Sequence, residues 1–223
     1  MALTGVDVTN KKLVIFDFDG TLADSMPGII RTARHVMHSR GWTDEALGDM
    51  RRIVGPPFPQ AFSLVYGVSA EEAASITEDY RAIYKNLDRD GWPLFDGMED
   101  LLRDLKAADC LLATASSKRD FLLERGLKTN EVYDLFDFPA AKRSDDGETK
   151  AQIIERVMGL AGVGAADAVM VGDRRFDCEA ASEVGIPCVG TLYGNTCQAE
   201  ELVNAGCCSI ASTVDELRRL LLG

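Results

Sequence analysis

Four short apolar runs constrain the fold of this chain more than any other sequence feature. They occupy residues 12–17, 110–115, 168–172 and 187–191, and the first stops at Asp17-Phe18-Asp19-Gly20. Continuous apolar runs of this length are typical of strands buried on both faces, as in a parallel sheet. Segments with helical periodicity follow, and the spacing of Thr213 and Glu216 is that of a capping box at the start of a last helix. The pattern predicts an α/β fold with a parallel sheet and right-handed crossovers.

One long stretch, residues 26–92, interrupts this alternation and contains no strand-like run. Four helix-sized pieces fill it, at residues 27–40, 43–54, 58–66 and 70–85. Glycines and prolines separate the pieces, and Ser69 with Glu72 forms a second capping-box pattern. We therefore predict a small helical cap domain (26–92) inserted into a core domain made of residues 1–25 and 93–223.

The chain is strongly acidic, which limits the partners it can bind. Its 223 residues include 24 Lys and Arg against 36 Asp and Glu, for a net charge of −12. An acidic surface repels a phosphate backbone at long range, so we expect no nucleic-acid binding. No run approaches the roughly 18 apolar residues of a membrane span, so we also expect no membrane association.

The opening segment and the cysteines predict the compartment. Residues 1–7 lack the basic region and apolar core of a secretory signal. The six cysteines form no CxxC pair, and several lie inside apolar segments, which is typical of reduced thiols. We expect a cytoplasmic protein.

Polar side chains that can carry chemistry gather where the apolar runs end. They are Asp17 and Asp19 after the first run, Ser116 and Ser117 after the second, and Asp173 and Asp177 after the third. Lys150 begins a predicted helix between the second and third of these positions. Because parallel strands bring their carboxyl ends to one edge of a sheet, these side chains are expected to meet there.

This set of residues suits phosphoryl transfer. Asp17 and Asp19 lie two residues apart and share a face of an extended chain, and Gly20 allows a tight turn with exposed N–H groups. Carboxylate oxygens are ligands for Mg²⁺, and a carboxylate beside a bound phosphate can attack it. A second, protonated carboxylate can give its proton to the leaving alkoxide, while Lys150 and Ser116 balance the charge.

The sequence resembles the haloacid dehalogenase-like (HAD) superfamily of aspartate-nucleophile phosphohydrolases, through four motifs in order. These are Asp17-Phe18-Asp19-Gly20-Thr21 after an apolar strand, Ser116, Lys150, and Gly172-Asp173 with Asp177. The resemblance implies a Rossmann-like HAD core with a four-helix cap.

The resemblance also implies a role for each motif residue. Asp17 would be the nucleophile, Asp19 the acid and base, and Lys150 a further catalytic residue. Phosphate would be bound by Gly20, Thr21, Ser116, Ser117 and Lys150. Mg²⁺ would be held by Asp17, the backbone carbonyl of Asp19 and Asp173, with Asp177 supporting the metal through water. Lys142 competes with Lys150 for the third motif, and Lys150 is favoured because it begins a helix.

Weaker similarities, including Gly55-Pro56-Pro57 and Asp96-Gly97-Met98, indicate the phosphoglycolate phosphatase-like branch. The expected activity is hydrolysis of a small phosphorylated metabolite such as phosphoglycolate, by a monomer or homodimer. A 5′-nucleotidase-like phosphatase, a sugar phosphomutase and a catalytically silent binding protein on the same scaffold remain as alternatives.

Overall fold

The computed structural model describes residues 5–145 and 147–223. We expect no secretory signal in residues 1–7, and the first four of these residues lie outside the described ones. Among those described, no helix combines the length and apolarity needed to cross a membrane.

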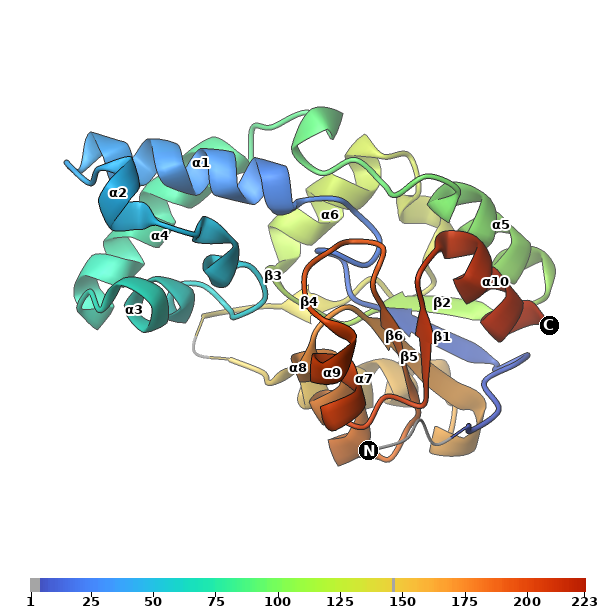
Figure 1. The fold of residues 1–223 in the computed structure, drawn as a ribbon. Helices are drawn as coiled ribbons and strands as arrows, with labels where there is room; N and C mark the ends of the chain where they lie inside the picture. Colours follow the sequence, from blue (N-terminus) through green and yellow to red (C-terminus); the bar gives the residue numbers. More distant parts are fainter. Residues whose placement is uncertain (1–4, 146) are drawn as a thin grey trace.

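A five-stranded, all-parallel sheet forms the centre of the molecule (Figure 1). Its order is β2 (Leu111–Thr114), β1 (Leu13–Phe16), β5 (Ala168–Gly172), β6 (Cys188–Thr191) and β7 (Ser209–Ala211). β1 lies between β2 and β5, so that Ile15 pairs with both Ala113 and Met170. All four residues of β1 are buried, as its uninterrupted apolar run predicts. The predicted parallel α/β fold is confirmed.

Helices cover both faces of the sheet, and alternate strand residues face opposite layers. On one face Val14 and Phe16 share a core with the helices α5 (Met98–Ala107), α6 (Asp120–Thr129) and α10 (Val214–Leu222). On the other face Leu13 and Ile15 pack with the helices α7 (Lys150–Ala161), α8 (Arg175–Val184) and α9 (Ala199–Asn204). Figure 1 shows these two layers above and below the strands.

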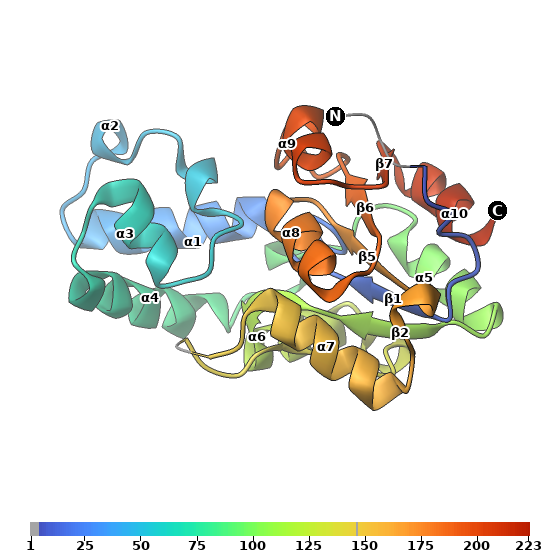
Figure 2. The same ribbon diagram turned by 90° about the horizontal axis from the view of Figure 1, so that it is seen from below.

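The helices of residues 26–92 lie together to one side of the sheet (Figures 1 and 2). They are α1 (Met26–Ser39), α2 (Asp44–Leu47), α3 (Gln60–Tyr66) and α4 (Ala70–Tyr84), with 3₁₀ turns at Met50–Ile53 and Arg89–Gly91. α1 packs along α4, and the aromatic side chains of Phe62, Tyr80, Tyr84 and Trp92 are buried. We call residues 26–92 the cap region, and its status as a separate domain stays a prediction.

Two predicted helices differ from the structure, and some short strands were not predicted. The helix predicted at 43–54 is wrong, because Gly48 adopts a φ of +54° and separates α2 from the 3₁₀ turn. The helix predicted at 58–66 begins only at Gln60, after Pro59 at the N-cap. β7 and a second sheet, which pairs β3 (Ser116–Arg119) with β4 (Ala141–Lys142), were not predicted. These strands are two to four residues long and carry polar residues, so no apolar run marks them.

We expect Ile15→Ala to lower the free energy of unfolding by about 2–5 kcal/mol, because Ile15 is fully buried in the central strand. Leu160→Ala is the control, since that side chain is 63% exposed and should change stability by no more than about 0.5 kcal/mol. Urea unfolding of both variants measures the difference. Equal losses would contradict the placement of β1 at the centre of the core.

Candidate active site

The turn that follows β1 holds Asp17 with both carboxylate oxygens occupied. Oδ1 accepts a hydrogen bond from the Phe18 N–H at 2.7 Å, and Oδ2 accepts one from Lys150 Nζ at 2.8 Å. The backbone N–H of Asp17 donates to the Val171 carbonyl, so the strand ladder reaches this residue. Asp17 is only 8% exposed. Its carboxylate is therefore fixed in direction at the edge of the sheet.

Gly20 is required at this turn for steric and conformational reasons. Its φ is +78°, and a Cβ there would lie 2.3 Å from Asp173 Oδ2. Thr21, the next residue, is fully buried, and its hydroxyl donates to Asp173 Oδ1 at 3.0 Å. Thr21 therefore contacts Asp173 by a hydrogen bond, and the backbone of Gly20 packs closely against the same side chain.

Asp173 and Asp177 complete an acidic cluster with Asp17. Asp173 follows β5, and Asp177 lies in the first turn of α8, where its Oδ2 accepts the Arg174 N–H at 3.0 Å. Carboxylate oxygens of the three aspartates lie within 4.8 Å of one another, and all three residues are buried. The strand ends therefore bring these predicted residues together.

Lys150 is the basic partner of this cluster. The capping box of Thr149 and Gln152 begins α7, so that Lys150 is its first residue. Besides its contact with Asp17, Lys150 Nζ lies 2.5 Å from Asp177 Oδ1. Lys142, the competing candidate, belongs to β4 instead.

Burial and repulsion between neighbouring carboxylates disfavour the ionised forms of Asp173 and Asp177. Burial, followed by the Asp177 and Asp17 charges, raises the pKa of Asp173, and burial also raises the pKa of Asp177 despite Lys150. Burial alone would lower the pKa of Lys150, but the Asp17 and Asp177 charges raise it above its ordinary value. Three carboxylates facing one ammonium thus form a buried site that a divalent cation would neutralise. Their oxygen donors fit Mg²⁺.

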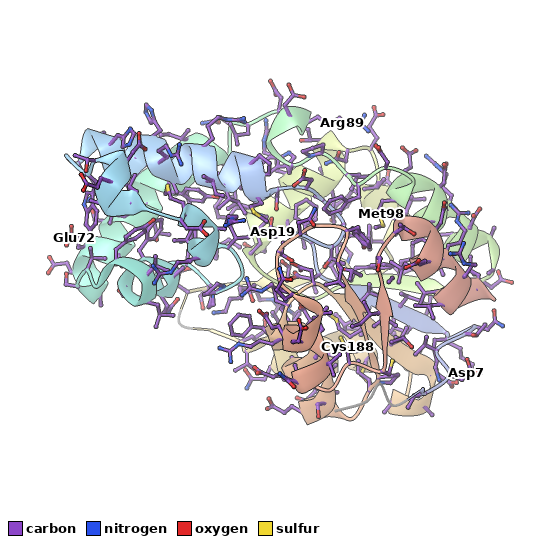
Figure 3. The ribbon with its side chains drawn as sticks, in the orientation of Figure 1. Asp7, Asp19, Glu72, Arg89, Met98 and Cys188 are labelled. Atoms are coloured by element: carbon purple, nitrogen blue, oxygen red, sulfur yellow. The ribbon has the colours of Figure 1, made fainter. Side chains whose placement is uncertain are left out.

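Asp19 lies between the cap region and the sheet (Figure 3) and has two partners. Its Oδ1 accepts a hydrogen bond from Ser25 Oγ at 2.5 Å and lies 2.9 Å from Lys118 Nζ. Lys118 was not among the predicted site residues. Its side chain is 5% exposed, and its ammonium lies 4.7 Å from the ring centroid of Tyr84. Its place two residues after Ser116 is the one sequence signal that identifies it.

A pocket opens between these groups and the cap region. Asp17, Asp19, Ser116, Ser117 and Lys150 line it, together with Asp173 and cap residues 53–58, 80 and 81. Ser116 is 1% exposed, and its hydroxyl oxygen accepts the Lys118 N–H at 3.3 Å. Two serine hydroxyls and the Lys150 ammonium thus line the same pocket as the Asp17 carboxylate, an arrangement that can hold a phosphoryl group.

Two arginines join the cap region to the rest of the chain. Arg174 Nη1 donates to the Val54 carbonyl at 2.5 Å, and a Cβ on Gly55 would lie 2.3 Å from the same nitrogen. From the cap side, both terminal nitrogens of Arg81 donate to the carboxylate of Asp145, at 2.8 and 2.7 Å. Neither contact was predicted, because each joins residues far apart in sequence.

We expect Mg²⁺ to raise the Tm of the wild-type protein, since the cation offsets repulsion among the three carboxylates. At about 100 times the Kd the shift should be on the order of 5 to 10 °C. Asp173→Asn should reduce the shift, and differential scanning fluorimetry with and without EDTA measures it. Asp167→Asn removes the same charge from an exposed ion pair and is the control. Equal shifts in both variants would contradict a cation site at Asp173.

Comparison with known proteins gives one family and several named relatives. The family model for haloacid dehalogenase-like hydrolases matches residues 14–191, which include all the predicted site residues. Tyrosine-protein kinase PtkA from Mycobacterium tuberculosis is 35% identical, over 94% of this chain and 72% of that protein. A 5′-nucleotidase from Pseudomonas aeruginosa is 30% identical, over 81% of this chain and 82% of the relative.

More distant sequence similarity and a solved structure agree with this picture. A phosphoglycolate phosphatase from Xanthomonas campestris pv. campestris is 26% identical, over 82% of this chain and 84% of the relative. The crystal structure of a predicted phosphatase from Clostridium acetobutylicum has a TM-score of 0.86 at 32% identity. That alignment covers 94% of this chain and 97% of the other, so it includes the cap region as well as the sheet.

Proposed function

Since the chain belongs to the haloacid dehalogenase-like hydrolase family, we propose that it is a Mg²⁺-dependent phosphatase. It would hydrolyse a small phosphate monoester through an aspartyl-phosphate on Asp17. The observation that carries this proposal is the Asp17 carboxylate, held at the pocket by Phe18 N–H and Lys150 beside two further buried aspartates. The relatives name phosphoglycolate and a 5′-nucleotide as esters of this kind.

In the first step an oxygen of Asp17 would attack phosphorus, and the bond from phosphorus to the ester oxygen would break. Protonated Asp19 would give its proton to the departing alkoxide, so that a neutral alcohol leaves. Ser25 and Lys118 orient the Asp19 carboxylate through their contacts with Oδ1. Ser116 and Lys150 would donate hydrogen bonds to the phosphoryl oxygens as the charge redistributes.

In the second step Asp19 would take a proton from water, and the water oxygen would attack the aspartyl-phosphate. The acyl phosphate bond would break, releasing inorganic phosphate and restoring the Asp17 carboxylate. Asp17 and Asp173 would hold the cation, and Asp177 beside them would support it. The family resemblance adds the backbone carbonyl of Asp19 as a further ligand. When bound, Mg²⁺ supplies positive charge that offsets the charge of the phosphoryl group and of the aspartates.

We expect Asp17→Asn to lower Mg²⁺-dependent phosphate release by on the order of 10³-fold or more, because the amide is not a nucleophile. Asp167→Asn on the exposed surface should release phosphate at the wild-type rate. Acid quenching during turnover, followed by mass spectrometry of peptides, should locate a phosphoryl group on Asp17 in the wild-type protein. Normal turnover by Asp17→Asn would overturn the proposal.

The acceptor of the phosphoryl group separates this function from the alternatives. Because a relative is named a tyrosine-protein kinase, the assay includes ATP with a protein acceptor as well as a panel of phosphate esters. Release of inorganic phosphate supports the phosphatase. Transfer to a tyrosine, formation of an isomeric sugar phosphate, or inactivity toward every ester would contradict it.

A further inference from the structure

The pocket extends past the reaction site into a largely apolar part. If the phosphoryl group lies at Asp17, the remaining space receives the leaving group. Its walls come from the cap region, α6 and α8, and the apolar ones include Ile53, Pro57, Phe58, Leu122 and Phe176. The side chains of these walls therefore help to determine which phosphate esters the pocket accepts.

The basic side chains in this part of the pocket already face protein carboxylates. The pairs are Arg81 and Arg119 with Asp145, and Arg174 with Glu201. Nitrogen–oxygen distances in these pairs run from 2.7 to 3.5 Å. Arg81 and Arg119 share the one carboxylate of Asp145, so each of these cations already contacts a protein carboxylate. A carboxylate on the substrate would have to compete with that protein carboxylate for the same N–H groups, and it would lose its water on entering the pocket. Both effects cost free energy.

Two aromatic rings in the same walls are partly accessible. Phe58, in the cap region, packs against Tyr80 with ring centroids 5.0 Å apart, which holds its orientation. Phe176, in α8, has the Arg175 guanidinium 4.8 Å from its centroid. Aromatic walls favour a flat, uncharged group through apolar burial and ring contacts.

We propose that the preferred substrates are phosphate monoesters of uncharged alcohols that carry an aromatic ring, and that esters with a carboxylate on the leaving group are disfavoured. This inference rests on the proposed function, since it requires the phosphoryl group to lie at Asp17. Of the esters named by the relatives, a nucleoside 5′-monophosphate meets this description and phosphoglycolate does not.

Three esters test charge and aromaticity separately. Isobutyl phosphate has nearly the shape of phosphoglycolate without its carboxylate, and benzyl phosphate adds a ring. We expect kcat/KM for isobutyl phosphate to exceed that for phosphoglycolate at least tenfold, and benzyl phosphate to exceed isobutyl phosphate. Phosphoglycolate as the best ester would overturn this inference and leave the phosphatase intact. Inactivity toward all three would count against the proposed function itself.

Substitution at Asp145 tests the role of the ion pairs. Asp145→Asn removes the shared partner of Arg81 and Arg119, so the ratio of kcat/KM for phosphoglycolate to that for isobutyl phosphate should rise at least fivefold. The ratio cancels any general loss of activity, and Asp167→Asn should leave it unchanged. Phe58→Leu should lower the ratio for benzyl to isobutyl phosphate. An unchanged ratio in Asp145→Asn, or in Phe58→Leu, would contradict the corresponding half of the inference.

Discussion

The buried ion cluster of Asp17, Asp177 and Lys150 is the interaction on which the rest of the site depends. Isolated charges at this depth would be strongly unfavourable, and Lys150 neutralises only one of the three clustered aspartates. The lysine reaches the cluster because the capping box of Thr149 and Gln152 begins α7 at that point. The position of Lys150 thus depends on the cap of α7, and its ammonium balances part of the charge that the strand order gathers there.

The parallel sheet makes such a cluster possible. β1 and β5 are neighbours, so the residues that follow them, Asp17 and Asp173, emerge side by side at the same edge. Close packing then demands glycine where carboxylates pass near the backbone. A Cβ on Gly172 would lie 2.2 Å from Asp177 Cγ, just as a Cβ on Gly20 would meet Asp173. Three of the 36 acidic residues of the chain thus lie close together at this edge, where their charges favour a bound cation.

Features encoded within a few residues were predictable, whereas those that join distant segments were not. The parallel sheet follows from the apolar runs, and the meeting of Asp17 with Asp173 follows from their places where those runs end. The place of Lys150 follows from the start of a helix, and the four motifs in order indicate the family. The pairing of Arg81 with Asp145 depends on how the cap region packs, and no local pattern encodes it. Gly48 divides the helix predicted at residues 43–54 because its backbone adopts a positive φ, which the surrounding sequence does not indicate.

The environment of Lys118 has a consequence for how this protein can evolve. Its ammonium lies 4.7 Å from the ring centroid of Tyr84 and 6.0 Å from that of Trp92, and both residues belong to the cap region. Its ionic partner, Asp19, lies instead in the turn that follows β1. The cap region thus supplies part of the surroundings of Asp19, the proposed proton donor. If the cap region were replaced by that of a relative with another specificity, the new segment would also have to provide aromatic rings around Lys118. This requirement limits which cap regions can be exchanged between relatives.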